Sequence, residues 1–494
     1  MNRGIHVYVG IFMIALAACG GDDSSGGGGG PICRDGLRFS LEDRDGIRVG
    51  VVGDGELRTP YIPSSSRSFG SAHWAPDGET LALSERNDES AVASTACEPF
   101  EFSTAGGSVV SFSPDGDQLL LTRNDEVDGR VVVSHLVVDV DGIELSEPVT
   151  LSAFDVAAAD GSYAYSVSAA WSPDSNHVAI AVVTDEEEAD FLPGHLYLVQ
   201  ADVIQPEAVE IGELSDAQSM AWSPDGRTIV FEDQDPGVLV VDTAAIDQVN
   251  RIDEDLLSCT FPTSESGFVW APSGGAFLYS TGPIDRSAPC ALREVRLDSD
   301  EATFSTRWIP DSSDAQPPAW FRDSRNVVHV SADGRTLLWA DPRESASSPI
   351  ATAEGDAIIG QFAFSPASNW LAIVRGPDVG SGELLVAATP GAPPDPATAV
   401  AVVQNPLAPF AIQWARSGDR LIVLGQHGVH VVLPDQVAEV AAEQAGWSPD
   451  SRYLALLQDG DVVMYLAGED AALADGQVVV AQEAQRVDWA PLPP

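Results

Sequence analysis

A pattern that recurs along the whole chain constrains its fold more than any other feature. An aromatic residue is followed by Ser-Pro-Asp-Gly or a variant of it, and then by an apolar run. Clear copies begin at Trp74, Phe112, Trp171, Trp222 and Trp447, and altered copies begin at Trp270, Trp320, Phe364, Trp414 and Trp489. The spacing ranges from 33 to 59 residues. A repeat of this length that contains strands predicts the blades of a β-propeller.

The chemistry of one repeat predicts a β-hairpin. Proline presets the backbone at the second position of a type I turn, and glycine closes the turn. The aromatic residue then ends one strand, and an alternating run such as 227–231 begins the next. A third strand follows in most repeats, for example at 195–199 and 237–241. We therefore expect an all-β protein of four-stranded antiparallel blades, each burying both faces against its neighbours.

The repeat resembles the TolB-type, WD40-like propeller repeat, and the resemblance covers about residues 37–494. It implies a propeller fold. TolB itself carries an α/β domain before a ring of six blades, whereas strands begin here soon after residue 36 and the repeats are more numerous. The resemblance therefore implies the fold and not a partnership with the Tol–Pal system.

The two ends of the repeat region complement each other. Residues 38–42 and 46–52 look like later strands without a preceding aromatic turn, and residues 487–489 look like a first strand without a successor. Joined, they complete one blade and close the ring, which removes free sheet edges. About ten blades result, while propellers typically have about four to eight. The alternatives are one wide ring or two joined rings, and we slightly favour two.

The N-terminal segment predicts a lipid anchor. A basic start and an apolar run of about 7–18 form a secretory signal too short to span a membrane comfortably. Residues 16–19, Leu-Ala-Ala-Cys, resemble the lipobox of bacterial lipoproteins, which implies a diacylglycerol on Cys19. We expect a signal peptide at 1–18, a lipidated cysteine with a disordered Gly/Ser tether at 19–35, and the propeller at 36–494. Gly20, not Asp, stands directly after Cys19, which favours the outer membrane, facing the periplasm or the cell surface.

Net charge and cysteines restrict the partners and the compartment. The formal charge of −50 disfavours nucleic acid and anionic lipid headgroups, so the lipid anchor is the only expected membrane contact. Four further cysteines in an oxidising compartment predict disulfides. We favour the pairs Cys33–Cys97 and Cys259–Cys290.

No recognisable catalytic motif or cofactor motif occurs in the chain. Neither a Gly-x-Ser-x-Gly elbow nor a His-Glu-x-x-His zinc motif is present, and we expect no cofactor. One acidic stretch has a carboxylate density compatible with Ca²⁺, although a solvated insertion is the simpler interpretation. Its acidic residues are Asp185, Glu186, Glu187, Glu188 and Asp190.

The residue before each repeat aromatic provides a candidate ligand site. It is small or apolar in most repeats, but polar at His73, Ser111, Gln413 and Asp488. In a closed ring these four residues come from nearly consecutive blades around the seam, the place where the first and last strands of the repeat region join. They could form a site for a ligand or an ion, and waters in a loosely packed seam are the alternative.

Three functions fit these features. We favour a non-catalytic binding scaffold at the cell envelope that engages a protein or another envelope polymer. The second is a polysaccharide lyase or hydrolase in the axial mouth, which would need His, Arg and Asp near one face. The third is a sensor of a small ligand or an ion.

Overall fold

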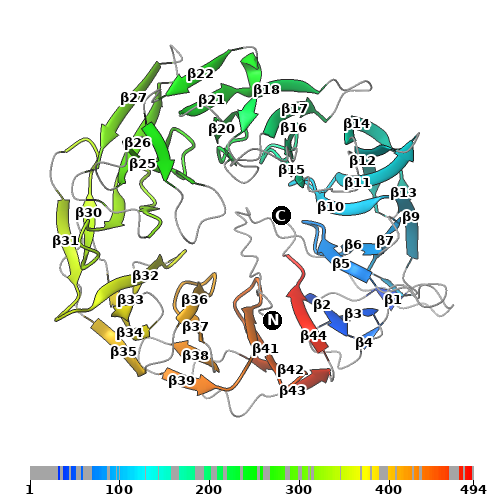
Figure 1. Ribbon diagram of the computed structural model, residues 1–494. Coiled ribbons are helices and arrows are strands. Elements are labelled where there is room, and N and C mark those ends of the chain that lie inside the picture. The colour runs from blue at the N-terminus through cyan, green and yellow to red at the C-terminus, as the bar shows by residue number, and fades with distance from the viewer. Residues whose placement is uncertain are drawn as a thin grey trace.

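The computed structural model is a single ring of ten β-propeller blades (Figure 1). It describes most residues from 32 to 491. Outside the description lie 1–31, 492–494 and a set of internal segments, of which the longest are 59–68, 157–165, 184–193, 389–398 and 467–477. Cys19, the predicted signal peptide and the acidic stretch 185–190 therefore lie outside the described residues. No helix of the described part is long and apolar enough to cross a membrane.

The first five blades contain these strands, given from the centre of the ring outward. Blade 1 has β44 (Ala484–Trp489), β2 (Arg38–Asp43), β3 (Gly46–Val51) and β4 (Leu57–Arg58). Blade 2 has β5 (Phe69–Trp74), β6 (Thr80–Glu85), β7 (Glu89–Ser94) and β9 (Glu101–Gly106). Blade 3 has β10 (Ser108–Phe112), β11 (Gln118–Val127), β12 (Arg130–Asp141) and β14 (Val149–Val156), with β13 (Glu144–Leu145) beside β12. Blade 4 has β15 (Ser166–Trp171), β16 (His177–Val183), β17 (Gly194–Gln200) and β18 (Val209–Leu214). Blade 5 has β19 (Met220–Trp222), β20 (Thr228–Glu232), β21 (Val238–Asp242) and β22 (Val249–Ile252), and the short 3₁₀ helix η1 (Thr243–Ala245) follows β21.

The other five blades follow the same scheme. Blade 6 has β24 (Phe268–Trp270), β25 (Ala276–Pro283), β26 (Ala291–Asp298) and β27 (Thr303–Trp308), with β23 (Leu256–Cys259) also pairing β25. Blade 7 has β28 (Ala319–Trp320), β29 (Val327–Val330), β30 (Thr336–Ala340) and β31 (Ser347–Thr352). Blade 8 has β32 (Ile358–Phe364), β33 (Trp370–Asp378), β34 (Ser381–Ala388) and β35 (Ala399–Asn405). Blade 9 has β36 (Pro409–Trp414), β37 (Leu421–Gly425), β38 (Gly428–Val432) and β39 (Val437–Val440). Blade 10 has β40 (Gln444–Trp447), β41 (Tyr453–Gln458), β42 (Asp461–Leu466) and β43 (Val478–Ala481).

The repeated turns join the first and second strands of the blades, as the sequence predicts. In the blade 3 turn, the Ser113 hydroxyl donates to Asp115 Oδ1 at 2.6 Å and accepts from the Gln118 amide at 3.0 Å. The same serine–aspartate contact recurs at Ser172, Ser223 and Ser448. The aspartate of these four turns is therefore structural, because its carboxylate accepts from the turn serine and holds the turn closed.

The last turn position adopts a left-handed backbone that favours glycine. At Gly226, φ is 73° and an added Cβ would lie 2.6 Å from Asp174 Cγ in the preceding blade. Serine occupies this position in three blades with a similar φ, for example 62° at Ser175. There the Ser175 hydroxyl accepts a hydrogen bond from the Asp115 amide of the preceding blade at 3.1 Å. Glycine thus avoids strain, whereas serine offsets it with a contact between blades.

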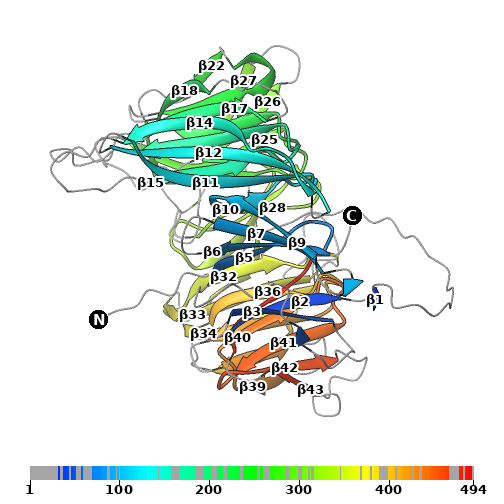
Figure 2. The same cartoon turned by 90° about the vertical axis from the view of Figure 1, so that its right-hand side faces the viewer.

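Ten buried hydrophobic clusters show that the blades form one ring. Each cluster lies between two successive blades, and together they occupy all ten interfaces, including that between blades 10 and 1. Figure 2 shows the same ring from the side, with the strands of successive blades stacked in layers. The expectation of two joined rings was wrong, because two rings would interrupt this series of packed interfaces.

Repeat tryptophans connect the blades through their indole groups. The indole N–H of Trp320 donates to the Val269 carbonyl of the preceding blade at 2.9 Å, and Trp414 bonds in the same way to Ala363 at 3.0 Å. The acceptor is the residue that precedes the aromatic of the neighbouring repeat. These tryptophans therefore pack blade against blade, in agreement with the sequence interpretation.

The ends of the chain close the ring as predicted. Strands β2 and β44 pair antiparallel, with Phe39 opposite Trp489 and Glu42 opposite Arg486. The Trp489 indole donates to the Gly446 carbonyl of blade 10 at 3.1 Å. Blade 1 is thus built from both ends of the repeat region.

The backbone places Cys33 directly opposite Cys97 in the small sheet of β1 (Ile32–Cys33) and β8 (Cys97–Glu98). Opposed residues of an antiparallel pair have Cα atoms about 4.5–5.5 Å apart, which a disulfide can span. Cys259 ends β23 and Cys290 precedes β26, on the two sides of β25. Both disulfides stay predictions.

Candidate functional site

The first strand of each blade lies at the centre of the ring, and the four predicted site residues all lie on such strands (Figure 1). Gln413 is on β36 of blade 9, Asp488 on β44 of blade 1, His73 on β5 of blade 2 and Ser111 on β10 of blade 3. Blade 10 has Gly446 at the same position. The four polar residues therefore lie on inner strands of nearly consecutive blades, with blade 10 between Gln413 and Asp488.

Two of the four residues belong to a polar cluster at the seam, which we call the seam cluster: Ser71, His73, Arg486 and Asp488. The Arg486 guanidinium pairs with Asp488, with Nε 2.7 Å from Oδ2. The His73 ring nitrogen Nε2 lies 3.1 Å from the Ser71 hydroxyl. The side chains of Arg486 and Asp488 are 51% and 37% exposed, so solvent reaches both.

Burial lowers the pKa of His73, and the positive charge of Arg486 lowers it further. The negative charge of Asp488 acts in the opposite direction. The imidazole is therefore held in its neutral form at neutral pH, with one nitrogen able to donate and the other able to accept a hydrogen bond. The cluster offers a cation, an anion and a neutral imidazole within electrostatic reach of one another.

Sequence reasoning missed Arg486 and Ser71. Each lies two residues before a predicted site residue on the same strand, and side chains two apart in a strand share a face. Applying this period to His73 and Asp488 would have found both.

Ser111 and Gln413 do not join the seam cluster directly. Gln413 is exposed and Ser111 is partly buried. Within the described residues, no hydrogen bond links either side chain to Ser71, His73, Arg486 or Asp488. They extend the polar lining along the inner strands on both sides of the cluster.

The repeated indole contact changes its partner at the seam. In blade 2, Trp74 donates to the Ser40 hydroxyl of blade 1 at 3.1 Å, whereas the four other described repeat tryptophans with a defined acceptor donate to a backbone carbonyl. Ser40 lies opposite Asp488 in the ladder between β2 and β44. The packing between blades 1 and 2 thus departs from the repeat where the polar side chains gather.

Metal binding finds no support among the described residues. No group of three or more His, Cys, Asp or Glu side chains in that part of the chain is placed to hold a metal ion. The predicted acidic stretch lies outside it, so its interpretation is untested.

Comparisons with known proteins show the fold and do not extend to an activity. No family model and no curated protein matches the chain. Among solved structures, the match to a eukaryotic initiation factor covers 93% of this chain and 99% of the factor, with 11% sequence identity and a TM-score of 0.50. The match to dipeptidyl peptidase 4 of Porphyromonas gingivalis covers 73% of this chain and 58% of the peptidase chain, with 11% sequence identity and a TM-score of 0.46. The match to an oligogalacturonate lyase from Vibrio parahaemolyticus covers 73% of this chain and 99% of the lyase chain, with 12% sequence identity and a TM-score of 0.33.

Proposed function

We propose that this protein is a non-catalytic binding scaffold of the bacterial cell envelope, anchored through a lipid on Cys19. The bound partner is an envelope protein or polymer that contacts the inner strands at the seam. One observation carries the proposal: the seam cluster is partly exposed, and its His73 and Asp488 stand where six other blades present a small or apolar residue.

The composition of the cluster suits recognition of a polar group. The exposed guanidinium of Arg486 offers several donors, and the neutral imidazole of His73 offers a donor and an acceptor. Asp488 holds the guanidinium through the 2.7 Å contact, so the arginine fork is oriented before a partner arrives. Preorganised groups lose less conformational entropy on binding, which favours affinity.

Site-specific photo-crosslinking in cells that make the full chain tests this proposal. A photoreactive amino acid replaces Gln413 on inner strand β36, and a matched control replaces Ser348, an exposed residue on outer strand β31. We expect one defined adduct from position 413, absent from position 348, that Arg486→Ala weakens strongly. An adduct that is equal at both positions, or that persists unchanged in Arg486→Ala, would refute binding at the seam.

The convergence of His73, Arg486 and Asp488 also favours a second candidate, an enzyme of the polysaccharide lyase or hydrolase type. A neutral imidazole can accept a proton, and a neighbouring guanidinium can stabilise the negative charge that develops. Incubation with extracted envelope polysaccharide would then release unsaturated or reducing ends, and His73→Ala would abolish the release. Binding without any such release supports the scaffold instead.

A further inference from the structure

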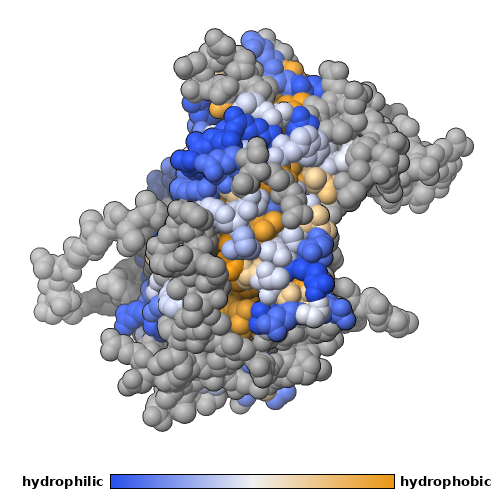
Figure 3. All heavy atoms as spheres, turned by 90° about the vertical axis from the view of Figure 1, so that its left-hand side faces the viewer, coloured by the Kyte–Doolittle hydropathy of each residue, from blue (hydrophilic) through white to orange (hydrophobic). Residues whose placement is uncertain are grey.

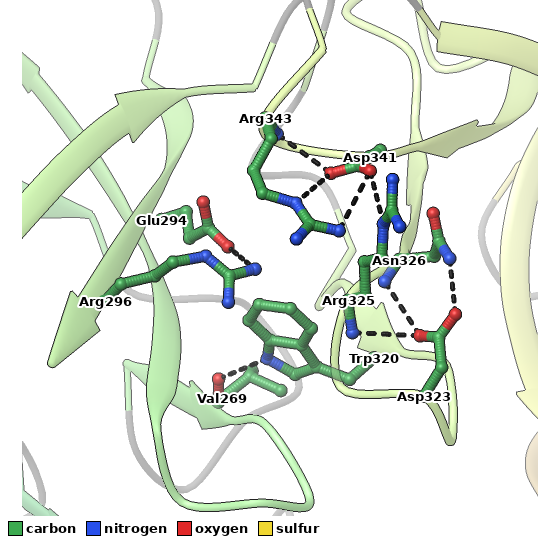
Figure 4. A network of polar contacts seen from close by, with 9 residues as sticks. All are labelled: Val269, Glu294, Arg296, Trp320, Asp323, Arg325, Asn326, Asp341 and Arg343. Carbon is green, nitrogen blue, oxygen red and sulfur yellow. Dashed lines mark hydrogen bonds and ion pairs between the residues drawn. The ribbon is translucent and has the colours of Figure 1, made fainter. Parts of the chain in front are cut away.

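A second polar cluster lies between blades 6 and 7, far along the chain from the seam (Figure 4). Its first half is Glu294, whose side chain on β26 is fully buried. The Arg296 guanidinium pairs with it, with NH2 2.6 Å from Oε1. The Nε of Arg296 is also buried and has no hydrogen-bond partner in the described part of the chain. One guanidinium thus balances the buried carboxylate and retains an unused donor.

The second half of this cluster is Asp341, which follows β30 in blade 7 and is 8% exposed. Two guanidinium groups hold its carboxylate. Arg325 Nε donates to Oδ2 at 2.6 Å, and Arg343 donates twice, through Nε to Oδ1 at 3.0 Å and through NH2 to Oδ2 at 3.2 Å. One carboxylate is therefore shared by two cations.

Positive charge exceeds negative charge across the two halves, because four arginines accompany three carboxylates, those of Glu294, Asp341 and the exposed Asp323 (Figure 4). Arg307 lies opposite Glu294 in the ladder between β26 and β27, which brings a fourth arginine to the two buried carboxylates. Burial raises the pKa of Glu294, the charges of Arg296 and Arg307 lower it and that of Asp341 raises it, so the two halves lie within electrostatic reach of each other. This local excess of cations contrasts with the formal charge of −50 on the whole chain.

The guanidinium groups of Arg296 and Arg343 point toward one another beside the Trp320 ring (Figure 4). Two cations that face each other repel, and an anion between them relieves that repulsion. Their side chains are 25% and 39% exposed, so a dissolved ion can reach Arg343 and the part of Arg296 that lies outside its buried Nε and NH2. On this side of the ring, Figure 3 shows hydrophilic residues gathered over its upper part. Dissolved salt screens charges that lie more than about 8 Å away at physiological ionic strength. The electric field at this site is therefore set by the nearby charges and less by the distant acidic surface.

We propose that Arg296 and Arg343 form a binding site for a small anion that carries a phosphate or carboxylate group. The paired N–H donors of a guanidinium match the oxygens of both groups. Arg307 and Arg325 add positive charge around the site. The site is independent of the seam cluster and of the proposed scaffold function.

Anion-dependent thermal stability tests this site. The melting temperature of the full chain is measured in sodium phosphate, in the sodium salt of a dicarboxylate and in sodium chloride, at equal ionic strength. An anion that binds only the folded chain raises this temperature. We expect phosphate, the dicarboxylate or both to raise it above the chloride value, and the response identifies which group is preferred.

Charge-removing variants locate the effect. Arg296→Gln and Arg343→Gln should each weaken anion binding by about tenfold to a hundredfold, since each removes charge-assisted hydrogen bonds. Arg227→Gln, at an exposed turn of blade 5, is the matched control and should keep the full response. Calorimetric titration of the unmodified chain with the same anions gives a second measurement should a variant fail to fold. Equal melting temperatures in all three salts without calorimetric binding, or a response that both variants retain, would overturn the proposal.

Discussion

Deleting residues 486–494 should strongly destabilise the protein, because the last strand is the inner strand of blade 1. This deletion removes residues 486–489 of β44 and with them most of the ladder to β2. It also removes the edge-on contact between Trp489 and Phe39, whose ring centroids lie 5.8 Å apart, and the indole hydrogen bond to Gly446. The blade would be left with three strands and an open inner edge.

The contacts of Trp489 and Phe39 set the size of the expected effect. Truncating a buried tryptophan costs about 3–5 kcal/mol, and Trp489 is partly exposed, so about 3 kcal/mol is expected for Trp489→Ala. The deletion also exposes Phe39, which is 1% accessible, at a cost of about 2 kcal/mol. Ladder hydrogen bonds add about 1 kcal/mol each. The total is a large part of the 5–15 kcal/mol or so by which a domain is usually stable.

Calorimetry and urea unfolding followed by circular dichroism measure this effect. The control is removal of residues 492–494 alone, which should cost several times less than Trp489→Ala. If the chain without 486–494 melts at the same temperature as the complete chain, β44 does not close the ring and the reasoning fails.

Four further outcomes follow from the sequence and the structure. Cys19→Ser should abolish labelling by a palmitate analogue and release the protein from membranes; equal labelling of both forms contradicts the anchor. Non-reducing peptide mapping should recover Cys33 linked to Cys97, and free thiols at both would exclude the bond. Ser175→Ala should cost about 1 kcal/mol more than Ser175→Gly in urea unfolding, because both variants lose the hydrogen bond between blades but only alanine keeps the left-handed strain; equal values would argue against this account. Burial lowers the pKa of His135 to about 4, so stability that is complete above pH 6.5 should fall as the pH decreases toward 4; a His135→Gln variant with the same acid sensitivity would show that other groups are responsible.

The fold was largely predictable because each blade repeats its own local signals. The turn residues, the alternating strands and the spacing all lie within one repeat, and the turn geometry at Ser113 and Asp115 follows from those residues alone. Closure by both chain ends was also predictable, since an incomplete unit at each end has only one partner that completes it.

Part of the candidate site could be predicted and part could not. His73 and Asp488 differ from the residues at equivalent repeat positions, so an alignment of the repeats isolates them. Their proximity to Arg486 depends on the ladder that joins strands from opposite ends of the chain. No repeat position marks Arg296 and Arg343 as partners, because they belong to different blades and meet only where those blades pack.

The sequence by itself determined the blade, the number of repeats and the way the ring closes, because these depend on short-range turn and strand preferences. Only the tertiary structure decided that ten blades make one ring. The angle between neighbouring blades is set by side-chain packing at every interface, and the ten clusters distribute this packing around a complete circle. The same packing decided which charged residues face each other across blades, since contacts between distant segments have no signature in local sequence.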